Sequence, residues 1–168
     1  MILRGGRVLL RPVEEADVER LAEILTEPEV ARWWHGYDAE RVRNEYVEPV
    51  GEEAYAIEVG GEVVGLLLVS EEPDADYRHA GLDIALATAA QGRGLGSETL
   101  RLAARHLFQE RGHHRITIDP AAANAQAIRA YERVGFRPVG LMRGYERGAD
   151  GTWHDGLLMD LLAAEFRA

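Results

Sequence analysis

Gln91-Gly92-Arg93-Gly94-Leu95-Gly96-Ser97 is the stretch that decides the fold. It follows an apolar run over 82–87 and precedes a helical pattern over 95–110, so it is predicted to turn a strand into a helix. The N–H groups of a first helical turn lack partners in the chain, and the helix dipole favours negative charge there. Because glycine has no side chain, it lets the backbone approach a phosphate closely. The stretch therefore predicts a phosphate-binding loop.

This loop matches neither of two common nucleotide-binding motifs. Its glycines at 92, 94 and 96 do not have the spacing of the dinucleotide fingerprint G-x-G-x-x-G. No Lys-Ser/Thr pair follows the last glycine, as a P-loop requires. The loop instead fits Q-x-x-G-x-G, from Gln91 through Gly94 to Gly96. Taken alone, such a cluster is equally consistent with a plain strand-to-helix turn.

A second motif lies one predicted strand further on, Asn124-x-x-Ala127-x-x-x-Tyr131-x-x-x-Gly135-Phe136. Together the two motifs resemble the GNAT superfamily of N-acetyltransferases. In that family the first motif binds the pyrophosphate of acetyl-CoA, and the second marks the helix beside the pantetheine arm. The resemblance is strongest over 82–136 and agrees with the order of elements over nearly the whole chain. It implies one acyl-CoA N-acyltransferase domain over 1–168, with acetyl-CoA as cosubstrate.

The rest of the chain predicts an α/β fold with a mixed sheet and helices on both faces. Gly60-Gly61 predicts a hairpin turn, and 71–76 an exposed acidic loop. The resemblance implies a mostly antiparallel sheet in which the parallel strands ending near Leu86 and Asp119 splay apart. Strands are predicted over 7–12, 54–59, 62–69, 79–87, 115–119, 137–147 and 152–158. Helices are predicted over 14–25, 28–34, a short stretch after Asp38, 95–110, 124–134 and, as a short terminal helix, 161–168.

Composition narrows the function classes. The chain has no cysteine, which excludes disulfides, thiolate metal sites and a cysteine nucleophile, so an acyl group would pass directly from donor to acceptor. The net charge of −10 argues against nucleic acid and favours a cationic ligand, although it also suits a merely well-solvated surface. No membrane span or secretory signal is present, so a cytoplasmic location is expected. No metal site is expected, because His113 and His114 would face opposite ways on a strand.

The resemblance also implies which residues hold acetyl-CoA. Backbone groups of the glycine loop would receive the pyrophosphate, and the end of the strand over 79–87 would pair with the pantetheine as an added strand. Asn124 would bond the pantetheine amide, or simply cap its own helix. Arg93 would contact phosphate, or remain a solvated surface arginine. The implied residues are Ile84, Ala85, Leu86, Gln91, Gly92, Arg93, Gly94, Leu95, Gly96, Ser97, Asn124, Ala127 and Tyr131.

Two catalytic roles follow from the chemistry of transfer to an amine. Tyr131 can protonate the departing thiolate of CoA, or serve only as one member of the apolar stripe of its helix. Asp83 is the preferred base for the acceptor ammonium, because a carboxylate in an otherwise apolar strand is costly without a function or a partner. Asp119 is the second candidate. Further candidates are His79, His154 and Asp155.

The acceptor is predicted from a narrower resemblance, to aminoglycoside 6′-N-acetyltransferases. It is carried by Trp33-Trp34, the hairpin over 55–65, Gly81-Leu82-Asp83 and Asp119-Pro120. The implied acceptor pocket consists of Trp34, Glu53, Tyr55, Asp83 and Asp119, because carboxylates beside an aromatic wall suit ammonium groups.

Other acceptors and a second class of function stay open. The ending over 150–155 resembles ribosomal-protein alanine N-acetyltransferases, which would make the acceptor a peptide N-terminus. A siderophore-related acyltransferase is a third reading, and an acyl-CoA sensor without turnover is the alternative from another class. The last strand pair, if exposed, could support a homodimer.

Overall fold

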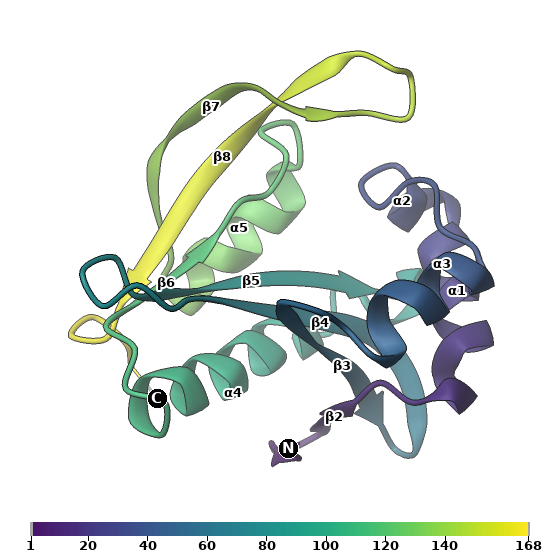
Figure 1. The fold of residues 1–168 in the computed structure, drawn as a ribbon, viewed down its shortest axis with the longest axis horizontal. Coiled ribbons are helices and arrows are strands. Elements are labelled where there is room, and N and C mark those ends of the chain that lie inside the picture. Colours follow the sequence, from purple (N-terminus) through teal and green to yellow (C-terminus); the bar gives the residue numbers. More distant parts are fainter. Residues whose placement is uncertain (1, 168) are drawn as a thin grey trace.

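A computed structural model describes residues 2–167, which form an eight-stranded mixed sheet with helices on both faces (Figure 1). The strand order is β1-β2-β3-β4-β5-β6-β8-β7, and among these described strands only β5 and β6 pair in parallel. This arrangement confirms the predicted fold class. The strands are β1 (Leu3–Arg4), β2 (Val8–Pro12), β3 (Glu52–Val59), β4 (Glu62–Glu72), β5 (His79–Leu86), β6 (Arg115–Ile118), β7 (Arg137–Arg147) and β8 (Trp153–Leu162). The helices are η1 (Glu15–Asp17), α1 (Val18–Thr26), α2 (Pro28–Ala31), α3 (Ala39–Val42), η2 (Arg43–Val47), η3 (Thr88–Ala90), α4 (Leu95–Gln109) and α5 (Ala125–Val134).

The parallel strands β5 and β6 separate soon after they meet. In the described part of the chain they pair only at Ala80↔Ile116 and Gly81↔Thr117. On its other side β5 stays paired with β4 as far as Leu86. The edge of β5 that faces β6 is therefore open beyond Gly81, as the resemblance implied.

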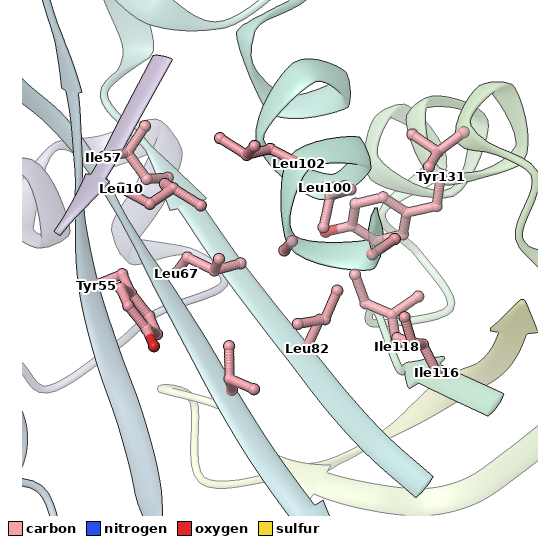
Figure 2. Packing of buried hydrophobic residues seen from close by; sticks show 14 of the residues in the cluster. Leu10, Tyr55, Ile57, Leu67, Leu82, Leu100, Leu102, Ile116, Ile118 and Tyr131 are labelled. Atoms are coloured by element: carbon pink, nitrogen blue, oxygen red, sulfur yellow. The ribbon is translucent and has the colours of Figure 1, made fainter. Parts of the chain in front are cut away.

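Each face of the sheet carries its own apolar core, because side chains alternate along a strand. Tyr55 and Ile57 of β3 pack on the face covered by α4 and α5, where Tyr131 also lies (Figure 2). Ala54 and Ala56 point to the opposite face, which α1 and α3 cover. Residues that differ by one position along β3 thus serve different sides of the molecule.

Two predictions of local structure are wrong. No helix forms over 161–167, because β8 continues to Leu162 through its pairing with Arg115 and a turn follows; Ala168 lies outside the described residues. Glu71 and Glu72 belong to β4 and not to a loop. Glu71 is held there by His113, whose Nε2 lies 2.7 Å from its Oε2, and by Arg111. The short strand β1 was not predicted at all.

Candidate active site

A cleft of about 1020 Å³ opens along the free edge of β5. In Figure 1, α1, α2 and α3 stand on one side of β5, and α5 with the arm of β7 and β8 stands on the other. The N-terminal end of α4 closes one end of the cleft. Of the residues predicted to bind acetyl-CoA or the acceptor, the cleft is lined by Trp34, Asp83, Ile84, Ala85, Leu86, Gln91, Gly92, Gly94, Gly96, Ser97, Asp119, Asn124, Ala127 and Tyr131.

The glycine loop has the geometry of an anion site. Gly92 and Gly94 have φ angles of 70° and 79°, which side chains other than glycine rarely adopt. The N–H of Glu98 donates to the Gly94 carbonyl (3.0 Å) and begins the helical bonding, so the N–H groups before it are left for a ligand. A Cβ on Gly92 would meet nothing within 4 Å, so there is open space in front of the loop. The loop therefore fits a pyrophosphate.

The loop is held in place by residues that the sequence patterns did not identify. Arg7 donates through Nη1 to the Arg93 carbonyl (3.0 Å) and through Nε to Glu98 Oε2 (2.8 Å). Glu98 Oε1 also accepts from the backbone N–H of Val8 (3.1 Å). These contacts join β2 to the loop, between segments too far apart in the chain for a local pattern to relate them.

Three predicted acetyl-CoA residues have structural contacts of their own. Gln91 donates through Nε2 to the Leu86 carbonyl (3.0 Å), which ties the loop to the end of β5. Leu95 is buried in the core, and Arg93 is exposed and does not line the cleft. The buried side chain of Leu95 leaves only its backbone groups for a ligand, and a contact of the exposed Arg93 side chain with phosphate stays a prediction.

Asn124 is the N-cap of α5. Its Oδ1 accepts a hydrogen bond from the N–H of Ala127 (3.2 Å). Capping occupies the oxygen and leaves the amide NH₂ group available toward the cleft, so the cap does not exclude a role in holding the pantetheine. The structure thus supports the capping alternative directly, and the ligand contact stays a prediction.

Asp83, Asp119 and Tyr131 line the cleft together and lie close enough for their charges to interact. The side chain of Asp83 is exposed to solvent within the cleft, although its carboxylate lies deep among protein atoms. This desolvation, with the charge of Asp119, raises the pKa of Asp83 to about 7. Burial and the charges of both aspartates also raise the pKa of Tyr131, so its phenol is neutral at physiological pH. Within residues 2–167 the Tyr131 hydroxyl makes no hydrogen bond.

Glu53 and Tyr55 do not lie in the cleft, contrary to prediction. They occupy the face of β3 that packs toward α4, where Tyr55 is buried and donates to Glu53. Arg111 Nη2 donates to Glu53 Oε2 (2.9 Å) and neutralises it. The neighbour Glu52 points the other way and does line the cleft. Burial and the charge of Glu45 raise the pKa of Glu52.

An aromatic wall faces the open edge of β5. Trp34 lies 6.2 Å from Tyr37, measured between ring centroids, and Tyr37 stacks on Tyr46 at 5.7 Å. Arg41 covers the ring of Tyr37 and is paired with Glu45 (Nε to Oε1, 2.7 Å). The helices η2 and α3 therefore complete a wall to which sequence reasoning assigned only Trp34.

The further base candidates lie outside the cleft lining. His79 Nδ1 contacts the Tyr77 carbonyl (2.7 Å) and His154 Nε2 contacts Asp150 (3.1 Å). Asp155 accepts from the N–H of Gly144 (2.8 Å). Glu146, which no pattern suggested, lines the cleft instead.

Two features of the described chain bear on other classes of function. Among residues 2–167 there is no cluster of three or more side chains able to hold a metal ion. None of the helices described is long and apolar enough to cross a membrane.

Comparisons with known proteins agree with this geometry. Residues 7–137 match a family model described as an acetyltransferase (GNAT) domain. The chain is 33% identical over 153 residues to aminoglycoside N(6′)-acetyltransferase type 1 of Klebsiella pneumoniae, covering 79% of this chain and 75% of that protein.

Two solved structures, each below 25% identity, share the fold. One is ribosomal-protein-S5-alanine acetyltransferase from Vibrio fischeri (TM-score 0.83, 14% identity, 100% of both chains). The other is spermidine N-acetyltransferase from Vibrio cholerae in complex with CoA and spermine (TM-score 0.80, 22% identity, 95% of this chain and 98% of that one). The family match spans most of the chain and includes both motifs that carried the resemblance. The chain belongs to the acetyltransferase (GNAT) family and is an acetyl-CoA-dependent N-acetyltransferase.

Proposed function

We propose that the protein acetylates a primary amine of a small polycationic acceptor such as an aminoglycoside. The observation that carries the proposal is the group of carboxylates that lines the acceptor side of the cleft: Glu52, Asp83, Asp119 and Glu146. Such a group attracts a ligand with several ammonium groups, and the aromatic wall at Trp34 can add cation–π contacts. The Klebsiella pneumoniae relative is named an aminoglycoside N(6′)-acetyltransferase, which supports the same acceptor class.

The donor site is proposed to be the glycine loop together with the free edge of β5. N–H groups from Gly92 to Ser97 would bind the pyrophosphate, and backbone groups of Ile84, Ala85 and Leu86 would pair with the pantetheine. When bound, acetyl-CoA supplies an activated acetyl group as a thioester. The proposal is supported by Asp83 and Tyr131, which line the same cleft as the glycine loop and the free edge of β5.

Asp83 is proposed to accept the proton that the acceptor ammonium must lose, directly or through a water. With a pKa of about 7, its carboxylate is a far better base near neutral pH than an ordinary aspartate. The freed amine nitrogen then forms a bond to the acetyl carbon while the bond from that carbon to sulfur breaks. As the amide forms, the nitrogen loses its second proton and the thiolate takes up one proton, so the single net proton released is the one held by Asp83.

Tyr131 is proposed to donate a hydrogen bond to the departing sulfur. Its pKa is raised, whereas a thiol has a pKa of about 8.5, so complete proton transfer from the phenol is unfavourable. Stabilisation of the developing negative charge by hydrogen bonding is the larger part of its role. The presence of both proton-handling groups in one cleft favours turnover over a binding-only sensor.

The test is an acceptor screen with the purified protein and acetyl-CoA. Release of free thiol is followed while the acceptors are varied among aminoglycosides, polyamines and peptides with a ribosomal-protein N-terminus. We expect turnover with a polycationic acceptor and a product heavier by one acetyl group in mass spectrometry. Turnover with the peptides alone would contradict the acceptor class, and failure to bind acetyl-CoA in calorimetry would contradict the donor site.

A further inference from the structure

Strand β7 departs from regular pairing beside the acceptor side of the cleft. Met142 pairs with Gly156 and Glu146 pairs with His154, so residues 143–145 stand opposite Asp155 alone. Within this bulge Gly144 has a φ of +55°, and its N–H donates to Asp155 Oδ1 (2.8 Å). Bulges of this kind commonly redirect a side chain next to a functional site.

The side chain that the bulge redirects is Tyr145. Its ring lies over Gly156, where an added Cβ would meet Tyr145 Cδ1 at 2.8 Å and Met142 Cε at 3.2 Å. From there its hydroxyl donates to Asp119 Oδ2. The segment after β6 runs alongside β8 at this point, with the N–H of Leu157 donating to the Pro120 carbonyl (2.9 Å), so Asp119 and Gly156 are held next to each other.

We infer that Tyr145 is a positioning residue that fixes Asp119 for the ammonium group of the acceptor. The hydroxyl occupies one oxygen of the carboxylate and leaves the other free to accept from the acceptor. Gly156 provides the space in which the ring lies, and Gly144 gives the bulge its conformation. The inference rests on the proposed function, since it assumes a cationic amine beside Asp119.

Tyr145 has no part in the proposed proton transfers, yet its hydroxyl has a defined orientation. Tyr145 is nearly half exposed, yet its phenol is aimed at a carboxylate in place of solvent. The hydrogen bond to Asp119, with partial burial and nearby carboxylate charges, raises the pKa of Tyr145 to about 12. The phenol therefore stays a proton donor throughout the pH range of activity.

The test combines Tyr145→Phe with Asp119→Asn in a double-mutant cycle. Tyr145→Phe keeps the ring and removes only the hydroxyl, so we expect KM for the acceptor to rise about ten-fold while kcat and KM for acetyl-CoA change little. In the Asp119→Asn background the same change should alter the acceptor KM by about two-fold or less, because the partner is already lost. Gly156→Ala, which displaces the ring, should reproduce the KM effect. Tyr77→Phe, an exposed tyrosine outside the cleft lining, is the matched control.

Three outcomes would overturn the inference. The first is an unchanged acceptor KM in Tyr145→Phe. If the parent protein turns the acceptor over, this outcome leaves the proposed function intact. A KM effect of equal size in the Asp119→Asn background would mean that Tyr145 touches the acceptor directly. A readout independent of activity is the ¹³Cζ resonance of Tyr145 at about pH 10, near the pKa of an ordinary tyrosine. At that pH the Tyr145 phenol should stay neutral in the parent protein and be partly ionised in Asp119→Asn. Equal ionisation in the two proteins would disprove the contact.

Discussion

Replacing Asp83 by asparagine tests the centre of the proposed chemistry. The change keeps the shape of the side chain and removes its charge and its basicity. Because the pKa of Asp83 is about 7, the carboxylate fraction rises roughly ten-fold between about pH 6 and about pH 8, from about a tenth to about nine-tenths. If this carboxylate is the base, kcat/KM must contain the same rise.

The rise has to be separated from the acceptor's own titration, since an amine also becomes more reactive as pH increases. We therefore expect the ratio of kcat/KM in the parent to that in Asp83→Asn to climb about ten-fold across this window and to level off above it. The ratio at its plateau should lie at about 10² or more, the usual contribution of a general base. Thiol release at several pH values with one acceptor measures it.

A control variant distinguishes the loss of the base at residue 83 from the loss of one negative charge on the protein. Glu62→Gln removes one negative charge from an exposed position outside the cleft and should show a flat ratio near one. A flat ratio for Asp83→Asn as well would refute the assignment of Asp83 as the base. A loss confined to the acceptor KM, without any pH dependence, would reassign Asp83 to acceptor binding alone.

Three further predictions concern the donor side and stability. Tyr131→Phe should lower kcat by about 10- to 100-fold, the effect of a lost hydrogen bond to a charged group, with the acetyl-CoA Kd from calorimetry unchanged; an unchanged kcat would remove Tyr131 from the leaving-group role. Gly94→Ala should strain a backbone at φ 79° by about 1–2 kcal/mol and weaken acetyl-CoA binding, so an unaltered Tm and Kd together would contradict the loop geometry. Asp83→Asn should raise Tm at pH values above 7, and this gain should disappear towards pH 4. The reason is that the pKa of Asp83 is higher in the folded state than in the unfolded state, so the parent protein loses stability as pH rises between these two pKa values.

The backbone geometry of the proposed donor site could be predicted from the sequence because it depends on local chemistry. Gly94 is required by its own φ angle, and Asn124 caps the helix that begins beside it. Each of these features lies within a few residues of the group that it serves. A motif can therefore report it without knowledge of the fold.

The acceptor half was predicted less well because it depends on strand register. The resemblance implied Glu53 and Tyr55 in the acceptor pocket, whereas in β3 Glu52 points into the cleft and those two residues point to the other face. Such an error of one position reverses the face of every side chain in a strand. Tyr145 was missed for a related reason, since only the bulge opposite Asp155 turns it toward Asp119.

In the proposed mechanism, the negative charge of the cleft both attracts the cationic acceptor and makes Asp83 a stronger base. The charge of Asp119 helps to raise the pKa of Asp83, and it would also attract an ammonium group of the acceptor. A bound polycation must offset that charge and so lower the pKa of Asp83 in the complex. Since kcat/KM reports the free enzyme and kcat the complex, the inflection of kcat should fall at a lower pH than that of kcat/KM. An acceptor with more ammonium groups should separate the two further, and coincident inflections for all acceptors would mean that the cation does not bind beside Asp83.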